Sequence, residues 1–214
     1  MFAELVALLA SVLTALSSVM ATRGMKDSNP DTANLLLSGV QMVVLTGILF
    51  LDFPSVNLTS LFWFALSGIS ASFLGRLLTL TSYKRIGVSV GSSLVGTSPI
   101  LTAILAILFL DEPLSIPVII GAIIVVAGIA ALNLRHGGFY IEFSSVYLPL
   151  TASLLFAVGN IMRKMGTNIQ PDAILGAQSS TLAGLLAFIF YLAIKGGPRD
   201  LQLNTKNFKW QIGR

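Results

Sequence analysis

The sequence predicts an all-α polytopic membrane protein, and three observations support this fold class. Of the 214 residues, 55% are hydrophobic and only 10% are charged, whereas an average soluble domain has about 25% charged residues. The mean hydropathy is +0.87. Apolar stretches recur along the whole chain, and their lengths are close to the roughly 20 residues that a helix needs to cross a bilayer.

Seven of these stretches predict transmembrane helices that are joined by short polar connections. They are continuously apolar rather than alternating, which favours helices over the strands of a membrane barrel. Short connections force consecutive helices to run antiparallel, and sequences such as Asn-Pro-Asp, Gly-Gly and Gln-Pro-Asp are typical of turns. The predicted spans are Leu5–Ala21, Leu35–Leu51, Leu61–Tyr83, Val88–Leu110, Ile116–Leu134, Val146–Met162 and Ala173–Ile194.

The composition argues against several classes of function. The chain has 13 Lys and Arg against 9 Asp and Glu, a set too sparse for a surface that binds nucleic acid. With no cysteine and one histidine, His136, it lacks the ligands of a typical zinc site and a cysteine nucleophile. We therefore expect no enzyme activity, no metal and no cofactor. The expected partners are the lipid bilayer and a small-molecule substrate, and a homodimer is compatible with the sequence.

Arg76 is the one clear charge inside a predicted span, because it lies eight residues before Lys84 at the basic end of the third span. An arginine at this depth costs at least about 2.5 to 3.5 kcal/mol. It should therefore face a wet cavity, or else snorkel or bind helix-end carbonyls. Ser72, Arg76, Thr79 and Tyr83 share one helical face, which suits a cavity or hydrogen bonds between helices.

An internal repeat is the most informative feature of the sequence. Residues 10–24 resemble residues 152–166, and Pro30-Asp31 recurs as Pro171-Asp172. The first unit, residues 1–136, would hold five helices, so the second unit, residues 137–214, would enter the membrane from the opposite side. Inverted repeats of this kind are typical of secondary transporters, whose binding site lies near the midplane between the halves.

The second unit holds only two predicted helices and the beginning of a third. We therefore expect a partial sequence, in which three helices of the second unit are missing. The alternative is an authentic seven-helix protein with a basic tail. Most basic residues lie opposite the N-terminus across the membrane, so the positive-inside rule places the N-terminus outside.

The region from the third to the fifth span resembles the EamA-type domain of the drug/metabolite transporter superfamily. The similarity rests on Tyr83–Gly91, on Pro99 in the fourth span, on the acidic turn Leu110–Ser115, and on Gly121 and Gly128 in the fifth span. The resemblance implies ten helices in two five-helix halves and transport of metabolites, mostly by ion coupling or exchange. It also implies an N-terminus inside, so the orientation stays open.

Four residues of this region have expected structural roles. Pro99 should kink the fourth helix or expose backbone to the cavity. Glu112 should complement the positive N-terminus of the fifth helix, and proton coupling is the alternative. The resemblance implies structural roles for Gly121 and Gly128. Asp111 stands where the family usually has glycine.

The sequence predicts a secondary transporter, an exporter or permease, that moves small polar or anionic metabolites by alternating access across the plasma membrane. The alternative is a non-transporting membrane scaffold or an inactive truncated remnant. Ser18 and Asn160 are equivalent in the repeat and end two polar stripes, which line the cavity or bond helix to helix. The predicted substrate-binding residues are Arg76, Ser72, Ser93, Gln41, Asn160, Gln178 and Ser18.

Overall fold

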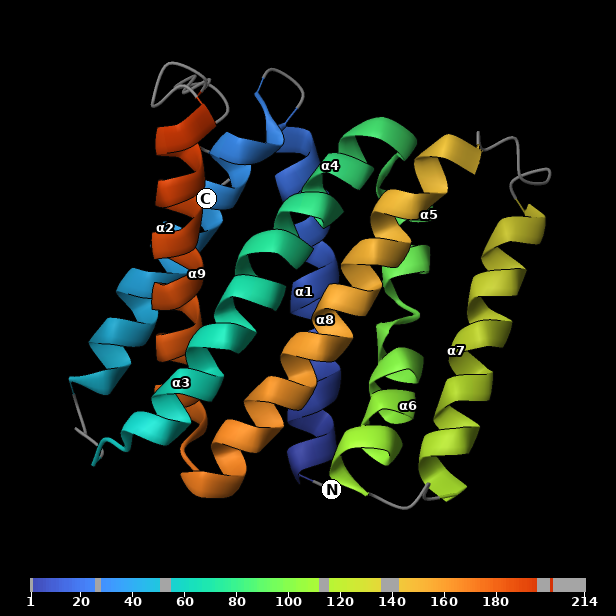
Figure 1. Cartoon of the computed structure of the whole chain (residues 1–214). Coiled ribbons are helices and arrows are strands. Elements are labelled where there is room, and N and C mark those ends of the chain that lie inside the picture. Colours follow the sequence, from blue (N-terminus) through green and yellow to red (C-terminus); the bar gives the residue numbers. More distant parts are fainter. Residues whose placement is uncertain are drawn as a thin grey trace.

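The computed structural model describes residues 2–25, 28–50, 55–111, 116–135, 143–195 and 201, and every regular element in these ranges is a helix. The predicted all-α fold is therefore confirmed. The crossings stand side by side and successive crossings alternate in direction, with α3 continuing into α4 and α5 into α6 (Figure 1). In chain order they are α1 (Phe2–Gly24), α2 (Pro30–Leu49), α3 (Leu58–Ser67), the π-helical segment η1 (Gly68–Gly75), α4 (Arg76–Ile86), α5 (Val88–Val95), α6 (Ser98–Leu110), α7 (Ile116–Arg135), α8 (Phe143–Ile169) and α9 (Ala173–Lys195).

The predicted spans coincide with these helices, singly or in series. Helices α3, η1 and α4 follow one another without a break, and α5 and α6 together form another crossing. Within the described ranges, the stretches long and apolar enough to cross a membrane are Pro30–Leu49, Leu58–Ile86, Val88–Leu110, Val146–Ile169 and Ala173–Lys195. A shorter apolar helix covers Leu8–Gly24, and α7 covers the predicted fifth span.

The span formed by α3, η1 and α4 is central, and it packs on α8 and α9 through small residues. A Cβ atom added to Gly184 of α9 would lie 2.8 Å from the carbonyl oxygen of Gly68. A Cβ added to Gly159 of α8 would lie 2.7 Å from the Cβ of Ala71. Without a hydrophobic driving force inside lipid, such close approach of backbones is what holds membrane helices together.

The two Pro-Asp turns of the predicted repeat both begin a helix, but they do so differently. The Asn29 side chain accepts a hydrogen bond from the Thr32 N–H at 2.9 Å, ahead of Pro30 in the first turn of α2. At α9 the cap is Asp172, which accepts from the Leu175 N–H at 2.8 Å. Because Asn29 is the cap at α2, Asp31 is free to pair with Lys195 at 2.7 Å.

Helix α8 runs in the direction opposite to α1, and α9 in the direction opposite to α2 (Figure 1). This is the arrangement that an odd number of crossings in the first unit requires. The division into residues 1–136 and 137–214 stays a prediction.

The structure describes Pro99, Gly121 and Gly128, three of the four residues with expected structural roles. Pro99 lies in the first turn of α6, directly after a break at Gly96 and Thr97 that divides the predicted fourth span into α5 and α6. Around Gly121 and Gly128 of α7, an added Cβ would have no neighbour within 4 Å. Their packing role stays a prediction, and Glu112 lies outside the described residues.

Candidate functional site

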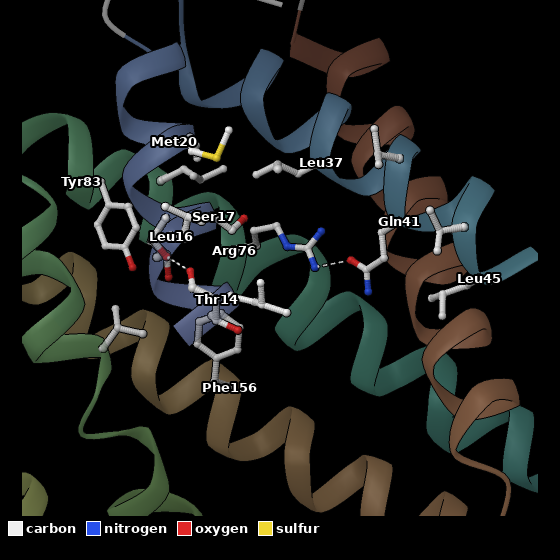
Figure 2. Close-up of a pocket in the computed structure, with 18 residues that line it drawn as sticks. Thr14, Leu16, Ser17, Met20, Leu37, Gln41, Leu45, Arg76, Tyr83 and Phe156 are labelled. Atoms are coloured by element: carbon white, nitrogen blue, oxygen red, sulfur yellow. Dashed lines mark hydrogen bonds between the residues drawn. The ribbon is translucent and has the colours of Figure 1, made fainter. Parts of the chain in front are cut away.

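A cavity of about 810 Å³ lies between α1, α2 and α4, with one residue each from α5 and α8 at its edge (Figure 2). Most of its wall is aliphatic. A small number of polar groups in a mainly apolar wall is the usual composition of a small-molecule site. The polar lining residues are Thr14, Ser17, Ser18, Gln41, Arg76, Thr79 and Tyr83.

Arg76 is the first residue of α4, and its side chain extends toward α2 (Figure 2). Its Nη1 donates to the Ser38 hydroxyl at 3.1 Å, and its Nη2 donates to Oε1 of Gln41 at 2.7 Å. Both partners are neutral. Among the residues that the structure describes, no carboxylate pairs with Arg76. The cavity therefore contains a positive charge without a counter-ion from the described chain.

The predicted polar face of the third span is only partly present. Arg76, Thr79 and Tyr83 line the cavity, whereas Ser72 does not. Ser72 lies in η1, and its Cβ would be 2.8 Å from a Cβ added to Gly184 of α9. The reason is that a π-helix bonds residue i to i+5 and turns less per residue than an α-helix. Ser72 is thereby rotated away from the face that Arg76 occupies.

The structure brings Gln41 and Ser18 together with Arg76 at this cavity. Gln41 fixes the guanidinium directly. The Ser18 hydroxyl donates to the Thr14 carbonyl at 3.0 Å, so it satisfies its own helix and leaves its oxygen at the cavity wall. These three of the predicted substrate-binding residues thus share one space.

The other predicted binding residues lie elsewhere, between helices. Ser93 is buried in α5 and donates to the Ser89 carbonyl at 2.8 Å. Gln178 of α9 is buried and donates to the Thr46 hydroxyl of α2 at 2.7 Å. The residues Ser72, Ser93 and Gln178 do not line the cavity. A substrate-binding role for them stays a prediction.

The two polar stripes of the repeat also differ in their surroundings. On α1, Thr14 and Ser18 line the cavity. On α8, Phe156 reaches the cavity edge, but Asn160 donates to the Thr102 hydroxyl at 3.4 Å. The Ser153 hydroxyl is likewise 2.9 Å from that of Thr97. Ser153 and Asn160 of the α8 stripe thus contact hydroxyls outside α8, and a substrate-binding role for Asn160 stays a prediction.

Two relevant residues were not among the sequence candidates. Ser38 is the second partner of Arg76. It lies three residues before Gln41 on the same face of α2, and this spacing is visible in the sequence. Arg163 lies inside the candidate span Val146–Ile169, and its buried Nε has no hydrogen-bond partner in the described structure. Arg163 lies directly after the predicted sixth span, which ends at Met162, and it is a second arginine within a candidate span because α8 continues to Ile169.

One end of the cavity is closed by a group of buried apolar residues, here named the α1–α2–α4 cluster: Ala21, Met25, Ala33, Leu80 and Tyr83. They come from the end of α1, the beginning of α2 and the later part of α4. Leu13 and Leu16, which line the cavity farther from this cluster on α1, are each 56% exposed. The cavity is thus bordered by a packed, buried cluster at the end where α1 ends and α2 begins.

Continuous apolar helices around a cavity with an intramembrane charge define the class of polytopic membrane transport proteins. The comparison with known families agrees, because the profile of the EamA-like transporter family matches residues 1–134. The chain belongs to the EamA-like transporter family, and it is an integral multi-pass membrane protein. No curated protein matches the chain.

Proposed function

We propose that this protein is a secondary transporter that binds a small anionic metabolite at Arg76 and moves it by alternating access. It acts as an exporter or permease, without an enzymatic step and without a cofactor. The plasma membrane as its location and a homodimer as its assembly are further predictions.

The observation that carries the proposal is the charge of Arg76 in the cavity with only neutral partners. A guanidinium has five N–H donors in a rigid fork, and Ser38 and Gln41 occupy one donor each. The remaining donors can bind a carboxylate or phosphate, for which a planar fork is well suited. An anion also supplies the counter-charge that the described residues around Arg76 do not provide.

The closed end of the cavity supports the transport mechanism. Alternating access requires that a central site open to one membrane face while it is sealed from the other. The α1–α2–α4 cluster provides such a seal from side chains without charge, and these can separate without breaking an ion pair.

The test is counterflow in liposomes that contain the full chain and are preloaded with unlabelled anion. Labelled lactate, succinate and glycerol 3-phosphate represent monocarboxylates, dicarboxylates and phosphate esters. We expect Arg76→Ala to lower counterflow about 10- to 150-fold, because a hydrogen bond to a charged group contributes about 1.5 to 3 kcal/mol. Arg76→Lys should restore only part of it, since lysine lacks the fork.

Arg85→Ala is the matched control, because it removes an exposed arginine from the same helix. It should leave counterflow unchanged. Wild-type counterflow in Arg76→Ala, or no counterflow of any of the three anions in the unmodified protein, would reject anion transport at this site.

A further inference from the structure

Asn34 of α2 is a buried amide without a partner. Its side chain has 0% exposure, and neither Nδ2 nor Oδ1 has a hydrogen-bond partner in the described part of the chain. Buried amides are normally hydrogen-bonded, because an unpaired one loses its water without compensation. An orphaned amide at this place therefore needs a partner from outside the described chain, such as water or a bound ligand.

The position of Asn34 connects it to the Arg76 site. It precedes Ser38 by four residues and Gln41 by seven, so the three side chains lie on one face of α2. Ser38 and Gln41 are the two partners of Arg76. One helical turn is about 5.4 Å, so Asn34 extends the same polar line by about one turn beyond Ser38.

This extension leads toward the sealed end of the cavity. Ala33, the neighbour of Asn34 in sequence, belongs to the α1–α2–α4 cluster, and Leu80 of this cluster lies one turn beyond Arg76 on α4. Asn34 does not line the present cavity. Separation of α2 from α1 and α4 at the cluster would join its amide to the Arg76 site.

We propose that Asn34 is a substrate-contact residue of the opposite access state, in which the cavity opens toward the face where α2 begins. The proposal rests on the proposed function. In that state the amide N–H donates to an oxygen of the anion as the anion leaves Arg76, and water or substrate satisfies the amide oxygen. The present state leaves the amide unsatisfied because it is sealed.

The first test uses the chain's lack of cysteine. A single Asn34→Cys variant of the full chain is exposed to a charged, membrane-impermeant maleimide in vesicles of either orientation. We expect labelling from the face where α2 begins and none from the other face. Ser180→Cys is the control, because Ser180 is equally buried but lies between α9 and α3, and it should stay unlabelled. Inertness of Asn34→Cys from both faces, or equal labelling from both, would overturn the proposal.

The second test separates a substrate contact from a structural role. Asn34→Leu removes an unpaired polar group from a buried site, so its melting temperature should equal or exceed that of the unmodified protein. Counterflow of the three anions should nevertheless fall about tenfold or more, the cost of a hydrogen bond to a charged ligand. Unchanged counterflow, or a fall explained entirely by lower stability and abundance, would contradict a contact role.

The two proposals can fail separately. Loss of counterflow in Arg76→Ala together with an inert Asn34→Cys would overturn the role of Asn34 and keep anion binding at Arg76. One-sided labelling of Asn34→Cys with normal counterflow in Arg76→Ala would reject the Arg76 site and, with it, the anion contact assigned to Asn34.

Discussion

Replacing Gln41 with glutamate should give Arg76 an internal counter-ion and thereby remove its attraction for substrate. Oε1 of Gln41 already accepts a hydrogen bond from Nη2 of Arg76 at 2.7 Å. Glutamate has nearly the same shape, so its carboxylate can occupy the same position. The substitution therefore changes the charge of the site with little change in its geometry.

The size of the effect follows from Coulomb's law. Two unit charges about 4 Å apart attract by about 4 kcal/mol at an effective dielectric constant of 20. A substrate anion must compete with this attraction, and each 1.4 kcal/mol corresponds to a factor of ten in affinity. The upper bound is therefore a loss of about a thousandfold in anion affinity, and relaxation of the side chains will reduce it.

Counterflow of lactate, succinate and glycerol 3-phosphate measures this loss, and the melting temperature in detergent reports on the fold. We expect Gln41→Glu to melt at or above the temperature of the unmodified protein while counterflow is lost. Gln41→Leu is the control, because it removes the hydrogen bond but keeps the uncompensated charge, and it should lose much less. Anion counterflow at the original rate in Gln41→Glu would refute the electrostatic reasoning.

Two further predictions concern packing and access. Gly184→Val should lower the melting temperature, because its Cβ would lie 2.8 Å from the Gly68 backbone oxygen and overpacking costs about 1 to 3 kcal/mol or more. The control Gly39→Ala should leave the melting temperature unchanged, because a Cβ there would have no neighbour within 4 Å. Equal stability of the two variants would argue against the close packing of α9 on η1. A polar thiol reagent should label Ser18→Cys, which lines the cavity, faster than Asn160→Cys, which faces Thr102. Equal rates would contradict the cavity assignment.

The sequence alone located Arg76 as a candidate, because charge inside an apolar span is so costly that it needs a functional or structural explanation. It could not find the partners of Arg76. Ser38 and Gln41 belong to another helix, and only the packing of α2 against α4 brings them within hydrogen-bond distance. The unpaired amide of Asn34 was hidden for the same reason, since a missing partner is a property of the packed structure.

Polar residues in the spans show where sequence reasoning is ambiguous. When only residue type and spacing are known, a water-filled cavity could be lined equally well by Ser93, Gln178 and Asn160 or by Gln41 and Ser18. The packed structure separates the two groups, because Gln41 and Ser18 line the cavity and the first three do not. A substrate-binding role for those three stays a prediction. For Ser72 the obstacle was backbone geometry, because the π-helical turns of η1 change the helical phase that the spacing assumed.

By itself, the sequence determined that the chain crosses the membrane as helices, roughly where each span lies, and that Arg76 lies inside the third of these spans. These properties follow from the local cost of placing polar groups in lipid, which each segment meets alone. Only the tertiary structure decided which polar side chains share the cavity, which end of it is sealed, and which amide is left unpaired. Those properties depend on the relative rotation and distance of helices, and in lipid these are set by close packing and hydrogen bonds between segments far apart in the chain.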